Sequence, residues 1–434
     1  MGRSSRHSHK KKPVGDQNTV HSGRCVSIGA KGDGEVVLDN GESIFVPYTA
    51  PGDEGVFEKS GRQGRVVSLD WQGQDRVEPP CPKYQLCGGC QLQHVSDEFQ
   101  RNWKKDLVMN ALVRSEVSAP DIDGFHVSPL HSRRRAVFGV TKNGNDVTIG
   151  FNARKSSRIV DIEGCIVLDK AILSALEPLR RLSRHLPADA FDIAVTSVQG
   201  GIDVAVRSRR LRYANDDYFL EVTRVAQGET FLRVSINGEL VFQRATPMVS
   251  FGDVAVPLPP GGFLQASVDG EAAIADAVLL GVGDAKRVAD LFAGSGTLSL
   301  RLAAAGKRVV AIDAEGPAIE ALKSAAKIAH GQGIIRHPVA AETRDLDERP
   351  LLAKELEKHD AVVFDPPRAG AAAQAIEIAQ SKIKTVVGVS CNPSTFARDA
   401  KILKDGGYTL SRLTLIDQFI HAAHVELVGV FLKA

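Results

Sequence analysis

The sequence of 434 residues predicts an α/β protein with a Rossmann-like C-terminal domain, an N-terminal β-barrel and an α+β central domain. Two observations predict the C-terminal domain. From about residue 265 onward, apolar strand patterns alternate with helix patterns, as in parallel sheets that helices cover on both faces. A Gly-rich turn also follows the first of these strands, where doubly wound sheets bind their ligands.

The N-terminal part of the chain is first polar and then rich in short strand patterns. Residues 1–15 contain much Ser, Lys and His without apolar periodicity, which predicts a disordered basic arm. In residues 16–70, short β-type runs such as EVVL alternate with Gly, Asp and Asn turns. This spacing predicts a five-stranded barrel of the OB type, which is either purely structural or a grip for nucleic acid.

Residues 71–260 form the predicted central domain. Strand patterns such as AVFGV and VTIGF mix there with a polar helix near 96–116 and a clearer helix near 170–184. Residues 261–434 then form the C-terminal domain. Its apolar strand patterns are KRVADLF, RVVAID, IIRHPVAA, DAVVFD and KTVVGVS, and YTLSRLTLIDQFI and HVELVGVFL close the chain as an antiparallel pair.

Composition and charge narrow the class of protein. Apolar residues make up 43% and charged residues 24% of the chain, and no apolar run approaches eighteen residues. The basic N-terminus leads into no apolar stretch, so we expect no secretory signal, no membrane partner and a cytoplasmic location. The net charge is only +2, and no obligate protein partner is evident. Basic runs at Arg133–Arg135 and around Arg207, Arg209, Arg210 and Arg212 are either solvated faces or contacts to RNA phosphates.

The turn after the first C-terminal strand carries Gly294 and Gly296, which allow close backbone approach to a ligand. Asp313 ends the second strand, where a carboxylate can accept hydrogen bonds from two ribose hydroxyls. Asp290 precedes the turn. The alternative roles are a helix cap for Asp313 and a turn-stabilising contact for Asp290. Together, the two acids and the turn resemble the S-adenosylmethionine site of class I methyltransferases.

The fourth strand ends in the motif DPPR, from Asp365 to Arg368. Two successive prolines fix an extended backbone without N–H donors, which makes a rigid shelf beside the ligand. Enzymes that methylate exocyclic amines carry NPPY at this place and use it to grip the amine. The motif DPPR therefore indicates a different chemistry.

Cys391 follows the fifth strand in SCNPSTFARD, where Asn392 and Pro393 turn the chain off the sheet and present the thiol near Asp365. A cysteine at a strand end is otherwise a small buried hydrophobe. A thiolate is required where covalent chemistry is needed, as at carbon 5 of uracil. Addition of the thiolate to carbon 6 makes carbon 5 nucleophilic towards a methyl donor, and a base must then remove the proton on carbon 5.

Glu426, in the apolar run HVELVGVF, is our candidate for this base, because burial raises the pKa of a carboxylate. The alternative for Glu426 is a charge on an edge strand facing water. His424 is the second candidate for the base.

The motifs DLFAGSGTLSL, DPPRAG, SCNPSTFARD and HVELV, in this order, resemble those of the RNA 5-methyluridine methyltransferases of the TrmA/RumA type. The segment GESIFVPYTAPGDEG is similar to the TRAM module, a small RNA-binding barrel. The resemblance implies an S-adenosylmethionine-dependent RNA (uracil-5-)-methyltransferase. It implies Cys391 as nucleophile, Glu426 as base, and Gln265, Phe292, Asp313 and Asp365 as cofactor contacts. The chain departs from the family at Thr297, where members often carry Asn or Asp.

Three of the 6 cysteines lie within ten residues, in CPKYQLCGGC, and Cys165 follows at a distance. Four thiolates suit zinc or a [4Fe–4S] cluster, and the single CxxC pair argues against zinc. Gly88 and Gly89 leave N–H groups that could bond cluster sulfides. The resemblance implies a [4Fe–4S] cluster on Cys81, Cys87, Cys90 and Cys165, which we expect to pin the central domain to this segment. Cys25 is left as a buried barrel residue.

The expected function is therefore methylation of a uridine in RNA, with ribosomal RNA favoured over transfer RNA. Two alternatives stay open at this point. One is a catalytically degenerate RNA-binding protein, and the other is an RNA methyltransferase for another base such as cytosine. The presence of both Cys391 and Glu426 argues against the first, and HVELV has no explanation in the second.

Overall fold

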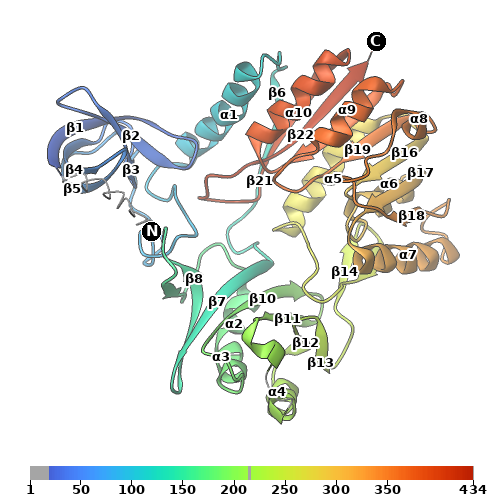
Figure 1. The fold of residues 1–434 in the computed structure, drawn as a ribbon, viewed down its shortest axis with the longest axis horizontal. Coiled ribbons are helices and arrows are strands. Elements are labelled where there is room, and N and C mark those ends of the chain that lie inside the picture. Colours follow the sequence, from blue (N-terminus) through green and yellow to red (C-terminus); the bar gives the residue numbers. More distant parts are fainter. Residues whose placement is uncertain (1–18, 214–216, 434) are drawn as a thin grey trace, which may run out of the picture. The chain divides into compact units, whose positions relative to one another are not determined.

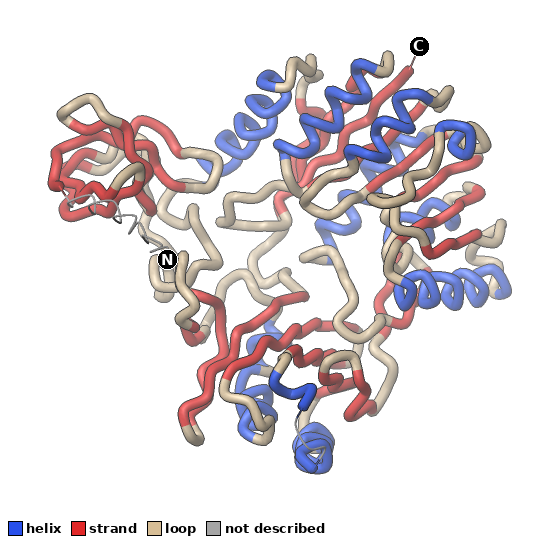
Figure 2. Tube along the Cα trace, in the orientation of Figure 1, coloured by secondary structure: helices blue, strands red, loops and turns tan. Residues whose placement is uncertain are grey.

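The computed structural model describes residues 19–213 and 217–433, apart from the side chains of 212, 213 and 217 (Figure 1). The basic arm predicted at 1–15 lies outside these residues. The chain separates into two compact units, Met1–Glu78 with Gln91–Phe99, and Pro79–Cys90 with Gln100–Ala434. The first unit is mainly strands, and the second combines helices with two large sheets (Figure 2).

The first unit is a closed barrel with the strand order β1-β2-β3-β5-β4, which confirms the predicted five-stranded barrel. Alternate residues point inward, and Cys25, Val36 and Phe57 are fully buried in its core. Cys25 is thus a buried barrel residue, as expected. The strands are β1 (Thr19–Ile28), β2 (Asp33–Leu38), β3 (Ser43–Pro47), β4 (Glu54–Ser60) and β5 (Gln63–Trp71).

The central part of the second unit is a seven-stranded sheet with the order β13-β12-β11-β10-β7-β8-β9. Three helices, α2 (Lys170–Ser174), α3 (Leu176–Arg184) and α4 (Asp217–Gln227), pack on one face through an apolar core. The strands are β7 (Arg135–Asn143), β8 (Asp146–Asn152), β9 (Ile159–Asp161), β10 (Ala190–Val198), β11 (Gly201–Arg207), β12 (Phe231–Ile236) and β13 (Glu239–Gln243). The predicted α+β character of this region is confirmed.

The eight-stranded sheet has the order β18-β17-β16-β19-β20-β22-β21-β6. Its first five strands are parallel, and β22 runs antiparallel between β20 and β21. Strand order reverses at β16, which creates the position where such sheets bind ligands. The strands are β16 (Arg287–Leu291), β17 (Arg308–Asp313), β18 (Ala340–Thr343), β19 (Ala361–Phe364), β20 (Thr385–Ser390), β21 (Tyr408–Asp417), β22 (Glu426–Lys433) and β6 (Ile122–Val127).

Helices cover both faces of this sheet (Figure 1). Buried residues of α5 (Val268–Val282), α6 (Thr297–Ala304) and α7 (Gly316–Gly331) form a core on one face. Those of α1 (Asp97–Arg114), α8 (Ala353–Leu356), α9 (Ala372–Gln380) and α10 (Pro393–Asp405) form a core on the other. The central strands are apolar throughout because they are buried on both sides. A short separate hairpin joins β14 (Met248–Phe251) to β15 (Val254–Pro257).

Two details of the sheet differ from the sequence-based expectation. β6 lies within residues 71–260, yet it pairs in parallel with β21 and so belongs to the sheet of the C-terminal part. The run IIRHPVAA is a strand only at its end, where β18 begins at Ala340. Pro338 within this run removes a ladder hydrogen bond, which is consistent with the short strand.

A buried ion-pair group joins the two sheets. Glu271 on α5 is fully buried, and its carboxylate accepts hydrogen bonds from Arg134 at 2.5 Å and Arg301 at 3.1 Å. Arg134 stands just before β7, and its Nε donates to the carbonyl oxygen of Gln265 at 3.2 Å. Its backbone N–H donates to the carbonyl oxygen of Ala266 at 2.9 Å. The segment that carries Gln265 is therefore fastened between the sheets.

Across the ranges 19–213 and 217–433, no helix combines the length and the apolar character that crossing a membrane would need.

We predict that Glu271→Gln destabilises the second unit strongly. The change leaves two poorly exposed guanidinium groups without their carboxylate, and breaking such a pair costs about 3–5 kcal/mol. Urea unfolding followed by the fluorescence of Trp103 on α1 measures the effect. The matched control is Glu221→Gln, which breaks an exposed pair with Arg224 and should cost less than about 1 kcal/mol. Equal losses in the two variants would contradict this role of Glu271.

Candidate active site

The turn after β16 is shaped by two glycines. Gly294 has a φ of 55°, and a Cβ atom built on it would meet nothing within 4 Å. Gly296 has a φ of 96° and begins α6, where a Cβ atom would come within 2.9 Å of Leu322. Gly296 thus lets α6 pack closely, and Gly294 opens the turn to a ligand.

Phe292, the residue directly after β16, also has a positive φ, of 62°. This conformation is an outlier for a bulky side chain, and such strained residues cluster at ligand sites. The ring is half-buried and packs against the core on the side of α9 and α10. Phe292 therefore lies at the sheet edge where the sequence placed a cofactor contact.

Asp313 ends β17 beside this turn. Its Oδ2 accepts a hydrogen bond from the N–H of Gly294 at 2.8 Å, and its Oδ1 accepts one from Glu315 at 2.7 Å. The carboxylate therefore stabilises the turn, as a cap would. Each carboxylate oxygen can accept a second hydrogen bond, so the pair of ribose hydroxyls expected from the sequence can still be accommodated.

Asp290 is fully buried below the turn. Ser299 on α6 donates to its Oδ2 at 2.5 Å, whereas its Oδ1 is buried without a hydrogen-bond partner. Burial above all, and then the nearby Asp365 and Asp313, raise the pKa of Asp290 to about 7. The unpaired oxygen and the open turn at Gly294 fit a ligand that brings a donor or a positive charge, as S-adenosylmethionine does.

A chain of hydrogen bonds connects the other predicted residues. Gln265 donates to Asp365 at 3.0 Å, and Gln418 donates to both the side-chain oxygen of Gln265 at 2.7 Å and Glu426 at 3.0 Å. The oxygen of Gln418 accepts the backbone N–H of Ala266 at 2.9 Å, which fixes its orientation. Asp365 and Glu426, from the ends of β19 and β22, are therefore linked through two amides.

The two carboxyl groups are electrostatically coupled. Burial raises the pKa of Glu426 to about 7, although Gln418 and Arg368 oppose the shift. Burial and the charge of Glu426 raise the pKa of Asp365 well above its usual value. Like charges in a buried site do not both ionise readily. The pair can therefore hold or accept a proton near neutral pH, which a single exposed carboxylate cannot.

Cys391 stands between β20 and α10, on a loop that its neighbours fix. Asn392 caps α10 by accepting the N–H of Ser394 at 3.1 Å, and its amide donates to the carbonyl oxygen of Arg368 at 3.1 Å. Thr395 donates to the same carbonyl oxygen at 3.3 Å. The motif SCNPST thus ties the cysteine loop to the DPPR loop. Cys391 and Asp365 are brought to the same edge of the sheet, as the sequence predicted.

The thiol of Cys391 is half-buried among charged groups. Burial, then Glu426, and more weakly Asp365 raise its pKa, whereas the charge and a hydrogen bond of Arg368 lower it. Arg368 is the cation that opposes the two carboxyl groups. The motif DPPR contains Arg368 without indicating this role, and no local pattern in the sequence points to Gln418.

His424 lies beside Arg368, with 3.1 Å between its Nε2 and an Arg368 nitrogen. Burial and the charges of Arg368, Lys104 and Arg133 lower the pKa of His424 to about 4. The ring is therefore neutral at pH 7, and Nε2 accepts the hydrogen bond from Arg368. Since that nitrogen is occupied, His424 is the weaker of the two candidates for a base.

The four predicted cluster cysteines are half-buried, and three of them, Cys81, Cys87 and Cys165, affect one another electrostatically. Burial, and then the charges of Cys165 and Cys81, raise the pKa of Cys87. Burial above all, with a further contribution from Cys81, raises the pKa of Cys165. Cys90 and Cys165 both act on the pKa of Arg133, which burial lowers. In the described part of the chain, however, no three or more His, Cys, Asp or Glu side chains form a group that could hold a metal ion.

The N–H groups of Gly88 and Gly89, which the sequence suggested for cluster sulfides, have different partners in the structure. The N–H of Gly88 donates to the carbonyl oxygen of Asn152 at 2.9 Å. The backbone of Cys87 pairs with that of Ala153 in an isolated antiparallel β-bridge. The N–H of Gly89 donates to the sulfur of Cys87 at 3.4 Å. Gly88 therefore holds the segment against the end of β8, and its N–H is not left free for a sulfide.

Comparisons with known proteins agree on one class of enzyme, the RNA methyltransferases. A family model described as tRNA (Uracil-5-)-methyltransferase matches residues 277–434. An uncharacterized RNA methyltransferase of Brucella melitensis is 42% identical, over 94% of this chain and 96% of its own. The 23S rRNA (uracil(1939)-C(5))-methyltransferase RlmD of Shewanella woodyi is 30% identical, over 91% of this chain and 92% of its own.

One solved structure supports the same fold. The tRNA (uracil-54, C5)-methyltransferase of Pyrococcus abyssi, in complex with S-adenosyl-L-homocysteine, is similar with a TM-score of 0.72. The sequences are 24% identical, and the similarity covers 94% of this chain and 99% of that one. This likeness establishes the arrangement of the strands and helices.

Proposed function

Because the chain belongs to the RNA (uracil-5-)-methyltransferase family, we propose that it methylates carbon 5 of a specific uridine in RNA through a covalent bond between Cys391 and carbon 6. S-adenosylmethionine is the methyl donor. The observation that carries this proposal is the meeting of a thiol with a coupled pair of buried carboxyl groups at one sheet edge. Addition, methylation and elimination at a uracil ring need one nucleophile and one base, and both are present there.

The first step is addition of the Cys391 sulfur to carbon 6. The thiol must lose its proton to solvent, because the thiolate is the nucleophile. Arg368 opposes the unfavourable effect of the two carboxyl groups on this ionisation. The electrons of the ring double bond move toward the carbonyl oxygen at carbon 4, and carbon 5 becomes nucleophilic. The DPPR loop thus supplies the cation that the thiolate requires.

The methyl donor fits the turn after β16. The open backbone at Gly294, the carboxylate of Asp313 and the unpaired oxygen of Asp290 are the groups that would hold it, with Phe292, Gln265 and Asp365 beside them. When bound, S-adenosylmethionine supplies the methyl group that carbon 5 accepts. The hydrogen bond from Gln265 keeps Asp365 in place at this edge.

The last step needs a base at carbon 5. Glu426, with a pKa of about 7, can accept the proton and release it again to water. The electrons of the broken C–H bond restore the ring double bond and expel the Cys391 thiolate. Gln418 holds the accepting oxygen of Glu426 and so orients it.

We place the target in ribosomal RNA, because the similarity to the Shewanella enzyme extends over almost the whole chain. In this proposal the barrel acts as a TRAM-type RNA-binding module and the protein works in the cytoplasm. Incubation with labelled S-adenosylmethionine and total RNA from a strain that lacks the gene tests the target. Label in transfer RNA alone, at any position, would exclude ribosomal RNA.

We also propose that Cys81, Cys87, Cys90 and Cys165 hold a [4Fe–4S] cluster. The effects of Cys81 and Cys165 on the pKa of Cys87, and of Cys81 on the pKa of Cys165, support a shared centre, and Cys90 acts on Arg133 together with Cys165. Such a centre would fasten the segment 81–90 to the turn at Cys165. The reaction proposed above needs no electron transfer, so the role is structural.

We predict opposite outcomes for the two reacting residues. Cys391→Ala should lower methylation by at least about 10³-fold and form no adduct, because the nucleophile is absent. Glu426→Gln should accumulate a protein–RNA adduct that survives denaturing electrophoresis, because addition proceeds but the proton on carbon 5 is not removed. Glu320→Gln, an exposed change on α7, is the control and should behave as wild type. Normal turnover by Glu426→Gln would exclude Glu426 as the base.

We predict that the rate of methylation falls in acid with the ionisation of Glu426. With a pKa of about 7, the ionisation of Glu426 alone should make the rate at pH 6 about tenfold lower than with Glu426 fully ionised, and the ionisation of Cys391, whose pKa is raised, adds to this fall. Gln418→Ala removes a hydrogen bond that stabilises the carboxylate, so the acid limb should move to higher pH. Single-turnover rates between pH 5.5 and 9 measure both effects, and the exposed change Gln227→Ala is the control. If the acid limb of Gln418→Ala stayed where it is in the wild type, the hydrogen bond from Gln418 would not control the ionisation of Glu426.

We predict that protein purified without oxygen contains iron and acid-labile sulfide in equal amounts, about four of each per chain. Cys165→Ser should lose both and lower the melting temperature, because the segment 81–90 is released. Cys25→Ser, in the barrel, should keep the iron. Zinc without sulfide in the wild-type protein would show that these cysteines hold zinc and not a cluster.

A further inference from the structure

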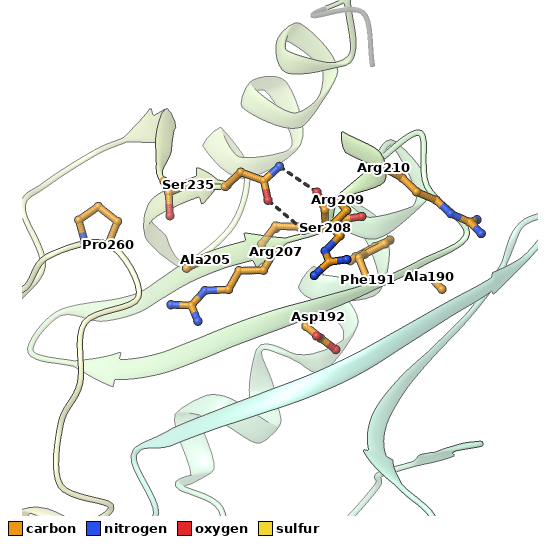
Figure 3. A pocket seen from close by; sticks show the side chains of 13 residues that line it. Ala190, Phe191, Asp192, Ala205, Arg207, Ser208, Arg209, Arg210, Ser235 and Pro260 are labelled. Carbon is orange, nitrogen blue, oxygen red and sulfur yellow. Dashed lines mark hydrogen bonds between the residues drawn. The ribbon is translucent and has the colours of Figure 1, made fainter. Parts of the chain in front are cut away.

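An open groove lies over the seven-stranded sheet, and the residues around Cys391 are not part of its lining (Figure 3). It encloses about 670 Å³ and is lined by the start of β10, by the ends of β11 and β12 with the turns that follow these two strands, and by Pro260. Its charged lining residues are Arg207, Arg209, Arg210 and Asp192, all of them exposed. The side chains of Arg207 and Arg210 extend in opposite directions along the groove (Figure 3).

The three arginines of the groove form no ion pair with any residue that the structure describes. No carboxylate of the described residues forms a salt bridge with Arg207, Arg209 or Arg210, and Asp192 lies across from Arg207 in the strand register without pairing with it. On the helices that cover the other face of the sheet, in contrast, Arg181 pairs with Glu229 at 2.7 Å and Arg224 with Glu221 at 2.7 Å. Among the described residues, the groove therefore carries three arginines and one acid, Asp192, and none of the three arginines is held in an ion pair.

A further arginine, Arg135, lies next to Arg207 of the groove. Arg207 and Arg135 both donate to the carbonyl oxygen of Gly261, each at 3.5 Å. The Nε of Arg135 is buried without a hydrogen-bond partner. Burial, and then the charges of Arg207 and Arg133, lower the pKa of Arg135. Two guanidinium groups on one carbonyl oxygen, with no acid between them, are costly unless an anion binds nearby.

Two residues before Arg135 in the sequence, Arg133 contacts the loop between β21 and β22. The guanidinium of Arg133 lies 6.0 Å from the ring centre of Phe419, and this ring is 6.0 Å from that of His424. His424 accepts the hydrogen bond from Arg368, which neighbours Cys391. Positive and aromatic groups thus follow one another from the groove to the nucleophile, which is the pattern of surfaces that bind single-stranded nucleic acid.

We propose that the groove at Arg207, Arg209 and Arg210 binds the phosphates of the single-stranded RNA that flanks the target uridine, and that Arg135 and Arg133 lead this strand to Cys391. The inference rests on the proposed function for the identity of the ligand. Guanidinium groups bind phosphate oxygens in pairs of hydrogen bonds, and the short side chains of Ala205 and Ser235 leave the floor open to a backbone. The side chains of Asn237 and Ser208 add hydrogen-bonding groups at one end, where Asn237 fixes the turn by two hydrogen bonds to Ser208.

The test compares two triple variants with equal loss of charge. The groove variant is Arg207→Ala, Arg209→Ala and Arg210→Ala, and the control variant is Arg181→Ala, Arg184→Ala and Arg224→Ala on the opposite face. Both are made in the Cys391→Ala background, so that binding is measured without reaction. The probe is a fluorescein-labelled oligouridylate of twenty nucleotides, titrated at several salt concentrations.

The groove variant should bind the probe at least about tenfold more weakly at low salt. Its slope of log K against log salt should be less steep by about 2, because each lost phosphate contact on a single strand contributes about 0.7. The control variant should keep the slope of the parent protein. In the active background, the groove variant should raise the KM for RNA and leave kcat unchanged, because no reacting group is touched.

An unchanged affinity and slope in the groove variant, or equal losses in both variants, would overturn the proposal even if methylation is intact. A wild-type protein that binds the probe through these arginines but methylates no uridine would instead refute the proposed function and leave the groove as an RNA site. The two failures are thus distinguishable.

Discussion

The buried carboxylate of Glu271 is the contact on which the site depends. It receives one guanidinium group from Arg134, just before β7 of the seven-stranded sheet, and one from Arg301 on α6, a helix that packs on the eight-stranded sheet. Arg134 at the same time holds the backbone of the Gln265 segment. The amide that reaches Asp365, and through Gln418 also Glu426, is therefore positioned by an ion pair outside the site. Removing two charges from water is costly, and this cost is offset only while all three groups stay in place.

The chemistry of the site follows from an imbalance of charge. Burial raises the pKa values of Asp290, Asp365 and Glu426, so the pocket disfavours full ionisation of its acids. Glu426 and Asp365 also raise the pKa of the Cys391 thiol, and Arg368 lowers it. A base with a pKa near 7 can take up and release a proton without a large free-energy difference, which suits the last step of the proposed reaction. The polar amides of Gln265 and Gln418 keep this balance by fixing distances rather than by adding charge.

Local patterns predicted much of this architecture, and contacts between distant segments account for the rest. Period and composition identified the barrel, the parallel strands and the closing pair, because burial on one or both faces leaves a direct trace in the residues. The motif SCNP predicted that Cys391 would lie near Asp365, since parallel strands end at one edge. Gln418 had no such trace, because its importance comes from partners 153 and 8 residues away. Similarly, β6 has an ordinary mixed pattern, and only its pairing with β21 shows to which sheet it belongs.

The position of β6 has a consequence for how the protein is made. The ribosome synthesises this strand early, whereas its neighbour β21 is among the last elements to emerge. Until then the edge of the growing sheet has no partner, and an unpaired edge is a template for aggregation. A fragment that began after the central sheet would carry the same exposed edge permanently. In the finished sheet β6 covers β21 and becomes the edge strand itself, so the ten residues of β21 are replaced at this edge by a strand of six.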